Sequence, residues 1–354
     1  MRTIAIVGAT FLCLFYGNSV FAQTDNFRLS VSPASVSLSA EPGTKTETQI
    51  RVKNDGLRTE KIKMGVVPFV GEDENGKPRL TEAKVEDEYL KWLTFSEQEF
   101  EIAPNEWRTI TATLELPQDA AFSYFYAITF SRAVNTDENA ATNIRGSVAV
   151  LLLLEAKVPN AVRNIGVEEF TIDRPWYEFL PVGFRLRLVN TGNVHVAPRG
   201  NIFISRGKGK DISILDVNAG GGNILPSSGR VFETSWEDGF PVYEKVVADN
   251  QFVLDENGKV VTKLKWDFSK ANKFRWGKYY ATLLMAYDDG VRDVPVEARL
   301  SFWVIPWRIL LVVFLVCFFT LFGALFIVRS FFRMIFRRRK KEKNSLEKSE
   351  NNDG

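Results

Sequence analysis

Few residues of this sequence have the types and spacing that catalysis or metal binding requires. The single histidine, His195, lies in VNTGNVHVAPRG, and nothing in the sequence indicates a nucleophile or an orienting acid for a hydrolytic triad. One histidine without cysteines beside it cannot supply the ligands of a typical zinc site. We therefore expect His195 to have a structural role, forming a hydrogen bond between strands near a turn.

Other clusters of polar residues are explained by turn chemistry. The tetrapeptide Asp-Glu-Asn-Gly occurs at Asp73–Gly76 and again at Asp255–Gly258, without the alternating oxygen ligands and distal glutamate of a calcium-binding loop. Asn-Gly tolerates a positive φ, which is typical of tight turns. Arg206–Lys210 lacks the spacing of a phosphate-binding loop, and Asp288–Asp289 is typical of a loop tip. The sequence thus predicts no enzyme, no cofactor and no small-molecule substrate.

A group of aromatic residues in and beside an insertion at 241–274 forms the candidate recognition surface. This insertion contains a predicted hairpin, QFVLDENGKVVTKLKW, with Asn257–Gly258 at its tip. Long insertions and exposed aromatic residues often bind partners, but they also cap the ends of sandwiches. Packing and recognition both remain open for these residues. The candidates are Phe240, Tyr243, Phe252, Trp266 and Phe268.

The elements that position these residues are predicted to be strands. Between Phe27 and Ser301, alternating apolar residues and short polar turns form two series of about seven strands each. This pattern predicts two immunoglobulin-like antiparallel β-sandwiches, divided near Val158–Val162. A membrane β-barrel also shows alternation, but charges opposite the core and a terminal helix favour the sandwiches. One short helix is predicted over Thr81–Leu93, from helical spacing of its apolar residues.

A transmembrane helix is predicted after the last strand. Ile309–Val328 reads ILLVVFLVCFFTLFGALFIV. This segment has no charged residue and is long enough to cross the hydrocarbon core of a bilayer as a helix. Trp303 and Trp307 precede it, at the depth that amphipathic rings favour. Basic residues follow it, which predicts a cytoplasmic C-terminus attracted to anionic lipid headgroups. The tail residues expected to make this contact are Arg337, Arg338, Arg339, Lys340 and Lys341.

The N-terminus completes a single-pass topology. Residues 1–22 resemble a signal peptide with a cleavage pattern at Val20–Ala22, so Gln23 is the expected first mature residue. An uncleaved anchor is the alternative, although its apolar run is short. The exported part carries net negative charge and no cysteine, which argues against a nucleic-acid surface and means that each domain folds without disulfides.

The predicted domain order combines these segments. We expect a plasma-membrane protein whose N-terminal domains are extracellular or periplasmic. The segments are a signal peptide at 1–22, a first sandwich at 23–158, a second sandwich at 159–304, a transmembrane helix at 305–328 and a basic cytoplasmic tail at 329–354. The part of the tail after Lys343 is short and polar, and we expect it to be disordered.

Several short motifs resemble one family. The second half carries LVNTGNVH at 188–195, ILPSSGR at 224–230, WGKY at 276–279 and FWVIPW at 302–307; the first carries Ser32–Pro33, Pro42–Gly43 and Ala103–Pro104. This order resembles bacterial cell-surface proteins of the WxL-interacting type. The resemblance implies two immunoglobulin-like domains, one membrane helix, and binding to peptidoglycan or surface proteins. The insertion at 241–274 and Ala120–Tyr124, where the family has Gly-Tyr, depart from it.

The leading interpretation is a non-catalytic, membrane-anchored cell-surface adaptor. It binds an envelope polymer such as peptidoglycan, or another surface protein, through strand edges and end loops. The alternative is a structural subunit of an envelope assembly, with Gly323 and Ala324 on a contact face of the membrane helix. A signalling receptor is disfavoured because the tail has no room for a catalytic domain.

Overall fold

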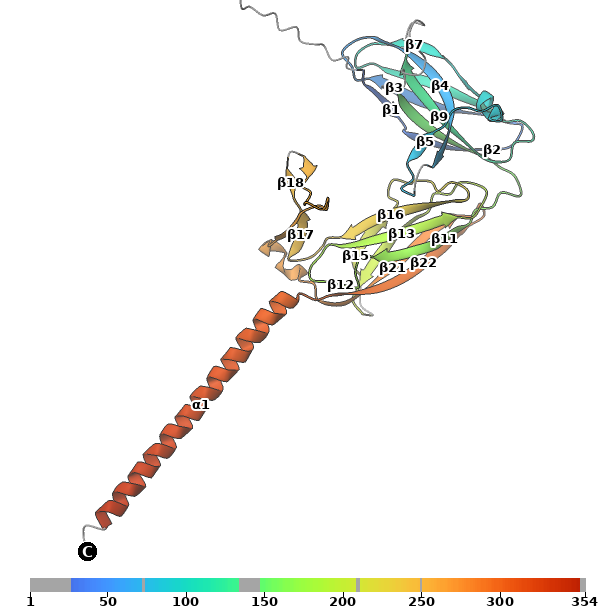
Figure 1. Cartoon of the computed structure of the whole chain (residues 1–354). Coiled ribbons are helices and arrows are strands. Elements are labelled where there is room, and N and C mark those ends of the chain that lie inside the picture. The colour runs from blue at the N-terminus through green and yellow to red at the C-terminus, as the bar shows by residue number, and fades with distance from the viewer. Residues whose placement is uncertain (1–26, 72–73, 134–146, 208–210, 249, 351–354) are drawn as a thin grey trace, which may run out of the picture. The chain divides into compact units, whose positions relative to one another are not determined.

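Strands make up most of the structure, and one long helix follows them (Figure 1). The computed structural model describes residues 27–71, 74–133, 147–207, 211–248 and 250–350, with side chains as far as Arg333. The signal peptide predicted at 1–22 lies outside these residues. The predicted all-β class, with immunoglobulin-like sandwiches and a C-terminal apolar helix, is confirmed.

The chain divides into two compact units. The first holds Met1–Glu72, Lys77–Val162 and Asn193–His195. The second holds Asp73–Gly76, Arg163–Gly192 and Val196–Gly354. Each unit is described below by itself.

The first unit is a sandwich of two sheets. One sheet has the order β1 (Leu29–Ser32), β3 (Lys45–Asn54), β8 (Trp107–Glu115), β6 (Leu93–Phe95). The other has the order β2 (Ser35–Ala40), β10 (Val148–Ala156), β9 (Phe122–Arg132), β4 (Glu60–Gly71), β5 (Pro78–Leu80), and β7 (Glu99–Ile102) also pairs with β4. The first strand therefore switches sheets, because β1 pairs antiparallel with β3 and β2 pairs parallel with β10.

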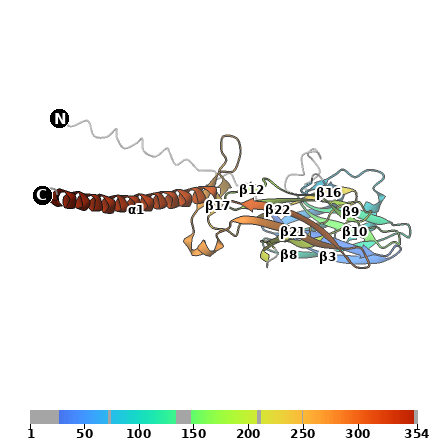
Figure 2. The same cartoon turned by 90° about the horizontal axis from the view of Figure 1, so that it is seen from below.

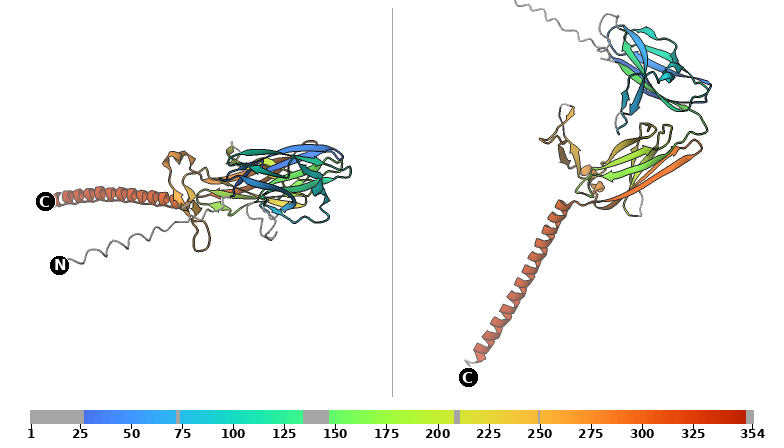
Figure 3. Two further views of the ribbon diagram at one scale, coloured as in Figure 1. Left: turned by 90° about the horizontal axis from the view of Figure 1, so that it is seen from above. Right: turned by 45° about the vertical axis from the view of Figure 1, so that its right-hand side comes forward.

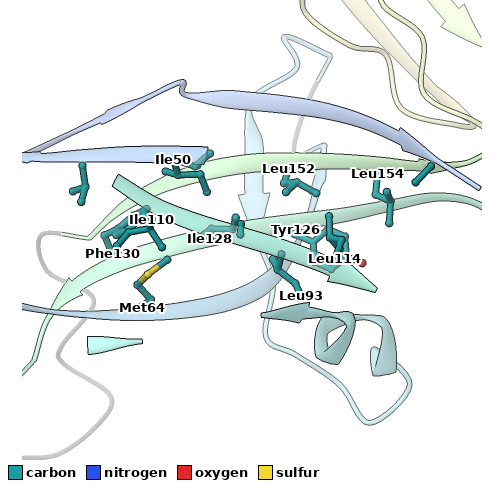
Figure 4. Close-up of a cluster of buried hydrophobic side chains, with 14 of the residues drawn as sticks. Ile50, Met64, Leu93, Ile110, Leu114, Tyr126, Ile128, Phe130, Leu152 and Leu154 are labelled. Atoms are coloured by element: carbon teal, nitrogen blue, oxygen red, sulfur yellow. The ribbon is translucent and has the colours of Figure 1, made fainter. Parts of the chain in front are cut away.

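The core of the first unit is largely aliphatic. Residues of β8 alternate between exposed and buried, as a strand with one face on a core requires. Figure 4 shows the side chains that meet between the sheets, with Tyr126 among the aliphatic residues. Its fully buried members include Ile50, Ile62, Ile110, Leu114, Ile128 and Leu152.

The helix predicted over Thr81–Leu93 is much shorter in the structure. Only η1 (Glu88–Trp92) is helical, as a 3-10 turn, and Leu93 already begins β6. Val85, which the helical spacing placed on the buried face, is 92% exposed. The Tyr89 ring contacts the rings of Trp92, Tyr124 and Tyr126, so aromatic packing fixes this turn.

The second unit repeats the same topology. One sheet has the order β11 (Ile165–Ile172), β13 (Val182–Asn190), β16 (Ser228–Trp236). The other has the order β12 (Trp176–Tyr177), β22 (Asp293–Val304), β21 (Gly277–Asp288), β14 (Arg199–Ser205), β15 (Asp211–Val217). Again the first strand switches sheets, since β11 pairs with β13 and β12 pairs parallel with the last strand, β22.

The core of the second unit is built around aromatic rings. Trp236 is fully buried, and its ring centroid lies 5.0 Å from that of Tyr279 and 6.1 Å from that of Phe302. Phe302 also contacts Phe184 and Tyr177 at its edge. These rings come from five strands of both sheets, so they join the two sheets.

The insertion between β16 and β21 is a hairpin followed by a short helix. β17 (Val242–Lys245) pairs with β20 (Thr262–Lys265), and β18 (Val247–Ala248) pairs with β19 (Gln251–Phe252). The turn at its tip is confirmed: Gly258 has φ +74°, and Leu254 bridges Val260 across it. η2 (Phe268–Lys273) returns the chain to β21.

The long helix begins almost directly after the last strand. β22 ends at Val304, and α1 (Trp307–Glu350) starts after Ile305–Pro306 (Figure 2). Over Trp307–Arg333 it is long and apolar enough to cross a membrane, with its apolar side chains exposed. The expectation of disorder after Lys343 is wrong as far as Glu350, because the helix continues to that residue. Its last part has no Gly or Pro and is rich in the helix formers Arg, Lys and Glu.

Candidate functional site

The outer edge of β22 is a long strand edge with almost no partner. β21 pairs with all twelve residues of β22 on one side. On the other side, within the described residues, only the two-residue strand β12 pairs with it, at Trp303 and Val304. The backbone of Asp293–Phe302 therefore has unpaired donors and acceptors along this edge, which is a template for another strand.

The direction of these backbone groups follows from one hydrogen bond. The Trp303 amide donates to the Pro175 carbonyl, 3.0 Å away and on the side opposite β21. Because successive residues of a strand alternate and the β21–β22 register has no shift, Glu297, Arg299 and Ser301 direct their N–H and C=O groups to the open side. The backbone of Pro295 also faces the open side, so the N–H that proline lacks would not have bonded to β21.

The side chains of β22 divide by face. Val294, Val296, Ala298 and Leu300 pack against the core cluster of the second unit, yet each remains partly exposed. An additional strand on this edge would cover them further. The opposite face is charged, and the Arg299 guanidinium stacks over the Tyr280 ring at 4.5 Å. Charges on an edge strand disfavour indiscriminate pairing.

Four of the five predicted recognition residues come together. The ring centroid of Phe240 lies 5.7 Å from that of Trp266 and 5.4 Å from that of Phe268, and Trp266 stacks on Phe268 at 6.3 Å. Tyr243 joins this group through Phe179, which lies 6.1 Å from Tyr243 and 6.4 Å from Trp266. We call Phe240, Tyr243, Trp266, Phe268 and Phe179 the aromatic cluster.

The cluster both packs and presents an outer surface. Phe179 is buried, and Phe240 and Tyr243 are half-buried. Trp266 is 47% exposed and Phe268 is 74% exposed. Packing therefore accounts for Phe179, Phe240 and Tyr243, while recognition by the exposed Trp266 and Phe268 stays a prediction.

Phe252 is not part of the aromatic cluster. It lies in β19, on the outer part of the hairpin, and is exposed. The Lys245 ammonium lies 5.2 Å from its ring centroid, the arrangement of a cation–π contact.

An ion-pair network fixes the chain on both sides of the insertion. The Asp238 carboxylate binds Lys273 and, at 2.9 Å, the Arg275 guanidinium, whose Nε also donates to the Asp238 carbonyl. Burial alone would raise the pKa of Asp238, but hydrogen bonds and charge from Lys273 and Arg275 outweigh it and lower this pKa. The start of η2 is capped by Asp267, which accepts the Ser269 amide at 3.2 Å. The exposed rings thus stand on an anchored segment.

A groove of about 1040 Å³ is lined mostly by residues of 173–185 and 233–237, and it reaches the base of the hairpin and the first turn of α1. Its lining includes Tyr243 from β17 and both Trp307 and Arg308 from α1. Figure 1 and Figure 3 show the hairpin beside the start of the helix. The insertion and the helix start therefore share one end of the second unit.

A buried acid forms part of this groove. The side chain of Glu178 is 10% exposed; its Oε1 lies 3.5 Å from Arg308 Nε, and its Oε2 accepts the Tyr243 hydroxyl at 3.5 Å. Burial, followed by the charge of Glu178, raises the pKa of Tyr243. The ion pair joins the first turn of α1 to the sandwich.

The described residues contain no constellation for metal chemistry. No group of three or more His, Cys, Asp or Glu side chains among them is placed to hold a metal ion. His195, grouped with the first unit, is 7% exposed; its Nδ1 lies 3.1 Å from Ser123 Oγ, and its amide donates to the same oxygen at 3.2 Å. The predicted hydrogen bond is confirmed, although His195 lies in a loop and not in a strand.

Sequence reasoning missed Glu178, Phe179 and the edge of β22. Each depends on the pairing of β12 with β22, which joins Trp176–Tyr177 to residues far along the chain. The only local signal was the apolar cluster WYEFLP at 176–181, which gives no indication of its partner.

Comparison with known proteins finds similar solved structures but no family. No protein-family model matches the chain, and no curated protein matches it. The chain is similar to the class 5 fimbriae chaperone CfaA, with 15% identity over 68% of this chain and 100% of that chain, at a TM-score of 0.33. It is similar to the E. coli chaperone DraB, with 12% identity over 77% of this chain and 98% of that chain, at 0.32.

A third similar structure is the Pseudomonas aeruginosa CupB2 chaperone, with 10% identity over 78% of this chain and 100% of that chain, at a TM-score of 0.30. Likenesses at this level carry no argument about function. The fold stands on the strand pairings described above. The immunoglobulin-like fold and the terminal apolar helix that the family resemblance implied are confirmed, while membership of the WxL-interacting type stays a prediction.

Proposed function

We propose that the chain is a non-catalytic, membrane-anchored cell-surface adaptor that binds another surface protein by strand addition to β22. In this proposal α1 crosses the plasma membrane, both sandwiches lie outside, and the basic residues after Val328 lie in the cytoplasm. The long apolar stretch of α1 with exposed side chains supports the anchoring. The observation that carries the binding role is the unpaired edge of β22 at Asp293–Phe302.

Strand addition suits this edge for two reasons. The outward backbone groups of Glu297, Arg299 and Ser301 offer main-chain hydrogen bonds, which supply affinity in this mode of recognition. The partly exposed Val296 and Ala298 offer apolar contacts to alternate side chains of the added strand. The charged outer face limits pairing to partners that complement Glu297 and Arg299.

Peptidoglycan is the other partner that the sequence suggested. A wall polymer needs a groove that is accessible from the cell wall. One end of the groove is lined by Trp307 and Arg308, beside the helix that crosses the membrane in the proposed topology, and this position restricts the access of such a polymer there. The open edge of β22 therefore favours a protein partner. Binding to peptidoglycan is measured beside it as the alternative outcome.

The test uses the full chain in proteoliposomes, incubated with purified peptidoglycan or with the secreted surface proteins. We expect a surface protein to be retained, and the double variant Glu297→Pro with Ser301→Pro to lose about thirtyfold in affinity, since two hydrogen bonds contribute about 1 kcal/mol each. The matched control, Glu297→Ala with Ser301→Ala, loses the same two side chains but keeps both amides, so it should bind much more tightly than the proline variant.

The outcomes separate the possibilities. Equal binding by the proline variant would exclude this edge as the site. Retention of peptidoglycan alone would replace the protein partner by the polymer. No retention of either above an unrelated sandwich, together with crosslinking to fixed membrane neighbours, would favour the structural-subunit alternative.

A further inference from the structure

Exposed aromatic rings from separate segments gather at the end of the second unit where α1 begins. Trp307 is in the first turn of α1 and is 45% exposed. Trp303, near the end of β22, is 47% exposed, and its register partner Trp176 in β12 is 53% exposed. Three tryptophans thus lie close to the start of α1: one in its first turn, and two on the paired strands that precede it.

The insertion adds Trp266 and Phe268 to this end. Trp266 directly follows β20, whose first residue, Thr262, lines the same groove as Trp307. Phe268 begins η2 and is the most exposed ring of the aromatic cluster. These two rings are held outward by the buried side of the cluster and by the Asp238 network.

The short connection to α1 limits how far this end can stand from a membrane. Only Ile305 and Pro306 separate strand from helix, which spans about 7 Å at most. The Ile305 amide donates to the Tyr177 carbonyl at 2.7 Å, so even this link is tied to the sandwich. The headgroup zone is roughly 5–8 Å deep on each side of the hydrocarbon core, which is the same scale.

Tryptophan rings, with an apolar body and a polar N–H, favour that zone over both water and hydrocarbon, and an exposed phenylalanine ring beside them buries at the boundary between headgroups and acyl chains. We propose that Trp176, Trp303, Trp307, Trp266 and Phe268 form a membrane-docking face, which lies in the headgroup region of the outer leaflet beside α1. The proposal rests on the anchoring by α1 in the proposed function. It fixes the second unit against the bilayer, so that the sandwich is mounted on the membrane and not displayed on a flexible stalk.

The occupant is a lipid surface because the face is continuous with the apolar surface of α1, where Leu310, Leu311 and Val312 follow Trp307 within two turns. A soluble protein bound at this end would have to share it with the leaflet that α1 enters. Two of the basic residues nearby form ion pairs within the unit, Arg308 with Glu178 and Lys273 with Asp238.

The test measures depth in the bilayer with the full chain. Cys13 and Cys317 are replaced by serine, one new cysteine carries a polarity-sensitive fluorophore, and the protein is placed in vesicles of equal parts phosphatidylcholine and phosphatidylglycerol. Bromine on the acyl chains then quenches labels at the interface or deeper. Phe268→Cys probes the docking face, Phe314→Cys probes α1, and Val291→Cys probes the far end of β22. Phe268 and Val291 are 74% and 93% exposed, so neither substitution removes core packing.

We expect the label at 268 to lose about half its fluorescence or more, as the label at 314 does, while the label at 291 keeps its signal. A quenched label at 314 with an unquenched label at 268 would overturn the docking face and leave the anchoring intact. Unquenched labels at both positions would overturn the anchoring as well. Equal quenching at 268 and 291 would also contradict the proposal, because the two ends of β22 must differ in depth.

Discussion

The two sandwiches share one topology and differ in how they finish it. In each, the first strand pairs in one sheet and then switches to run parallel with the last strand of the other. In the first unit, β2 covers six of the nine residues of β10. In the second, β12 covers two of the twelve residues of β22. The same strand switch thus covers most of the last strand in the first unit and only the end of the last strand in the second.

A second difference lies in the connection from β16 to β21. The equivalent connection of the first unit, from β8 to β9, spans only 116–121. In the second unit it spans 237–276 and carries the hairpin, η2 and the exposed rings. Both differences place exposed surface on the second unit, which also carries α1 and to which both proposals assign binding. Two domains of one topology can therefore differ in role: the first has short connections around its core, and the second carries the exposed edge, the insertion and the helix.

The largest expected effect distinguishes the two cores. Trp236→Ala removes a fully buried ring that contacts Tyr279 and Phe302, so the second unit should lose about 4 kcal/mol of unfolding free energy. The first unit has its own core and should keep its stability. Hydrogen exchange of the full chain in detergent, read separately for each unit, makes the measurement.

Trp276→Ala is the matched control for this change. Trp276 is 51% exposed, and its loss should cost well under 1 kcal/mol. If Trp236→Ala lowered protection equally in β3 and β8 of the first unit, the two sandwiches would unfold as one, and the comparison between separate units would be wrong.

The next effect tests the direction of the open edge with adjacent residues. The backbone N–H and C=O groups of Ala298 point toward β21, whereas those of Glu297 point to the open side. Ala298→Pro should therefore cost about 3 kcal/mol, because it removes a ladder bond. Glu297→Pro should cost much less, as the native Pro295 indicates. Chemical denaturation of the full chain in detergent compares them, and equal losses would mean that both sides of β22 are paired.

How much of this could be predicted from the sequence depends on the range of the interactions. Period-two alternation is local, so it predicted the strands and the sandwich class, and Asn257–Gly258 predicted the hairpin tip. Helical spacing over Thr81–Leu93 was overridden by the aromatic packing of Tyr89. The coverage of β10 and β22 is set by pairings between distant segments, which no local pattern specifies.

The predicted aromatic set illustrates the same limit. Residue type identified five candidates, but only contacts could show that Phe252 stands apart and that Phe179 belongs with the others. Glu178 is a single acid in an apolar run, and its role beside Arg308 exists only because β12 pairs with β22 and leads into α1.

The smallest expected effect concerns the connection that the first unit lacks. Asp238→Asn weakens the ion pairs to Lys273 and Arg275 and should cost about 1 kcal/mol at neutral pH, because the carboxylate is partly exposed and screened by solvent. The folded pKa of Asp238 is lowered below its ordinary value of 3.8, so the ionised carboxylate stabilises the fold above that pH. This contribution declines as the pH falls below 3.8 and is gone below the folded pKa.

The difference in stability between wild type and Asp238→Asn should accordingly shrink on acidification, as measured by thermal unfolding at a series of pH values. Asp293→Asn is the matched control, because it removes an exposed carboxylate of the second unit and leaves the ion pairs of Asp238 in place. Since Asp238 holds both ends of 237–276, its loss should also raise hydrogen exchange in η2 before it does so in β21. A uniform change across the second unit would mean that the insertion is not an independently anchored segment but part of the sandwich core.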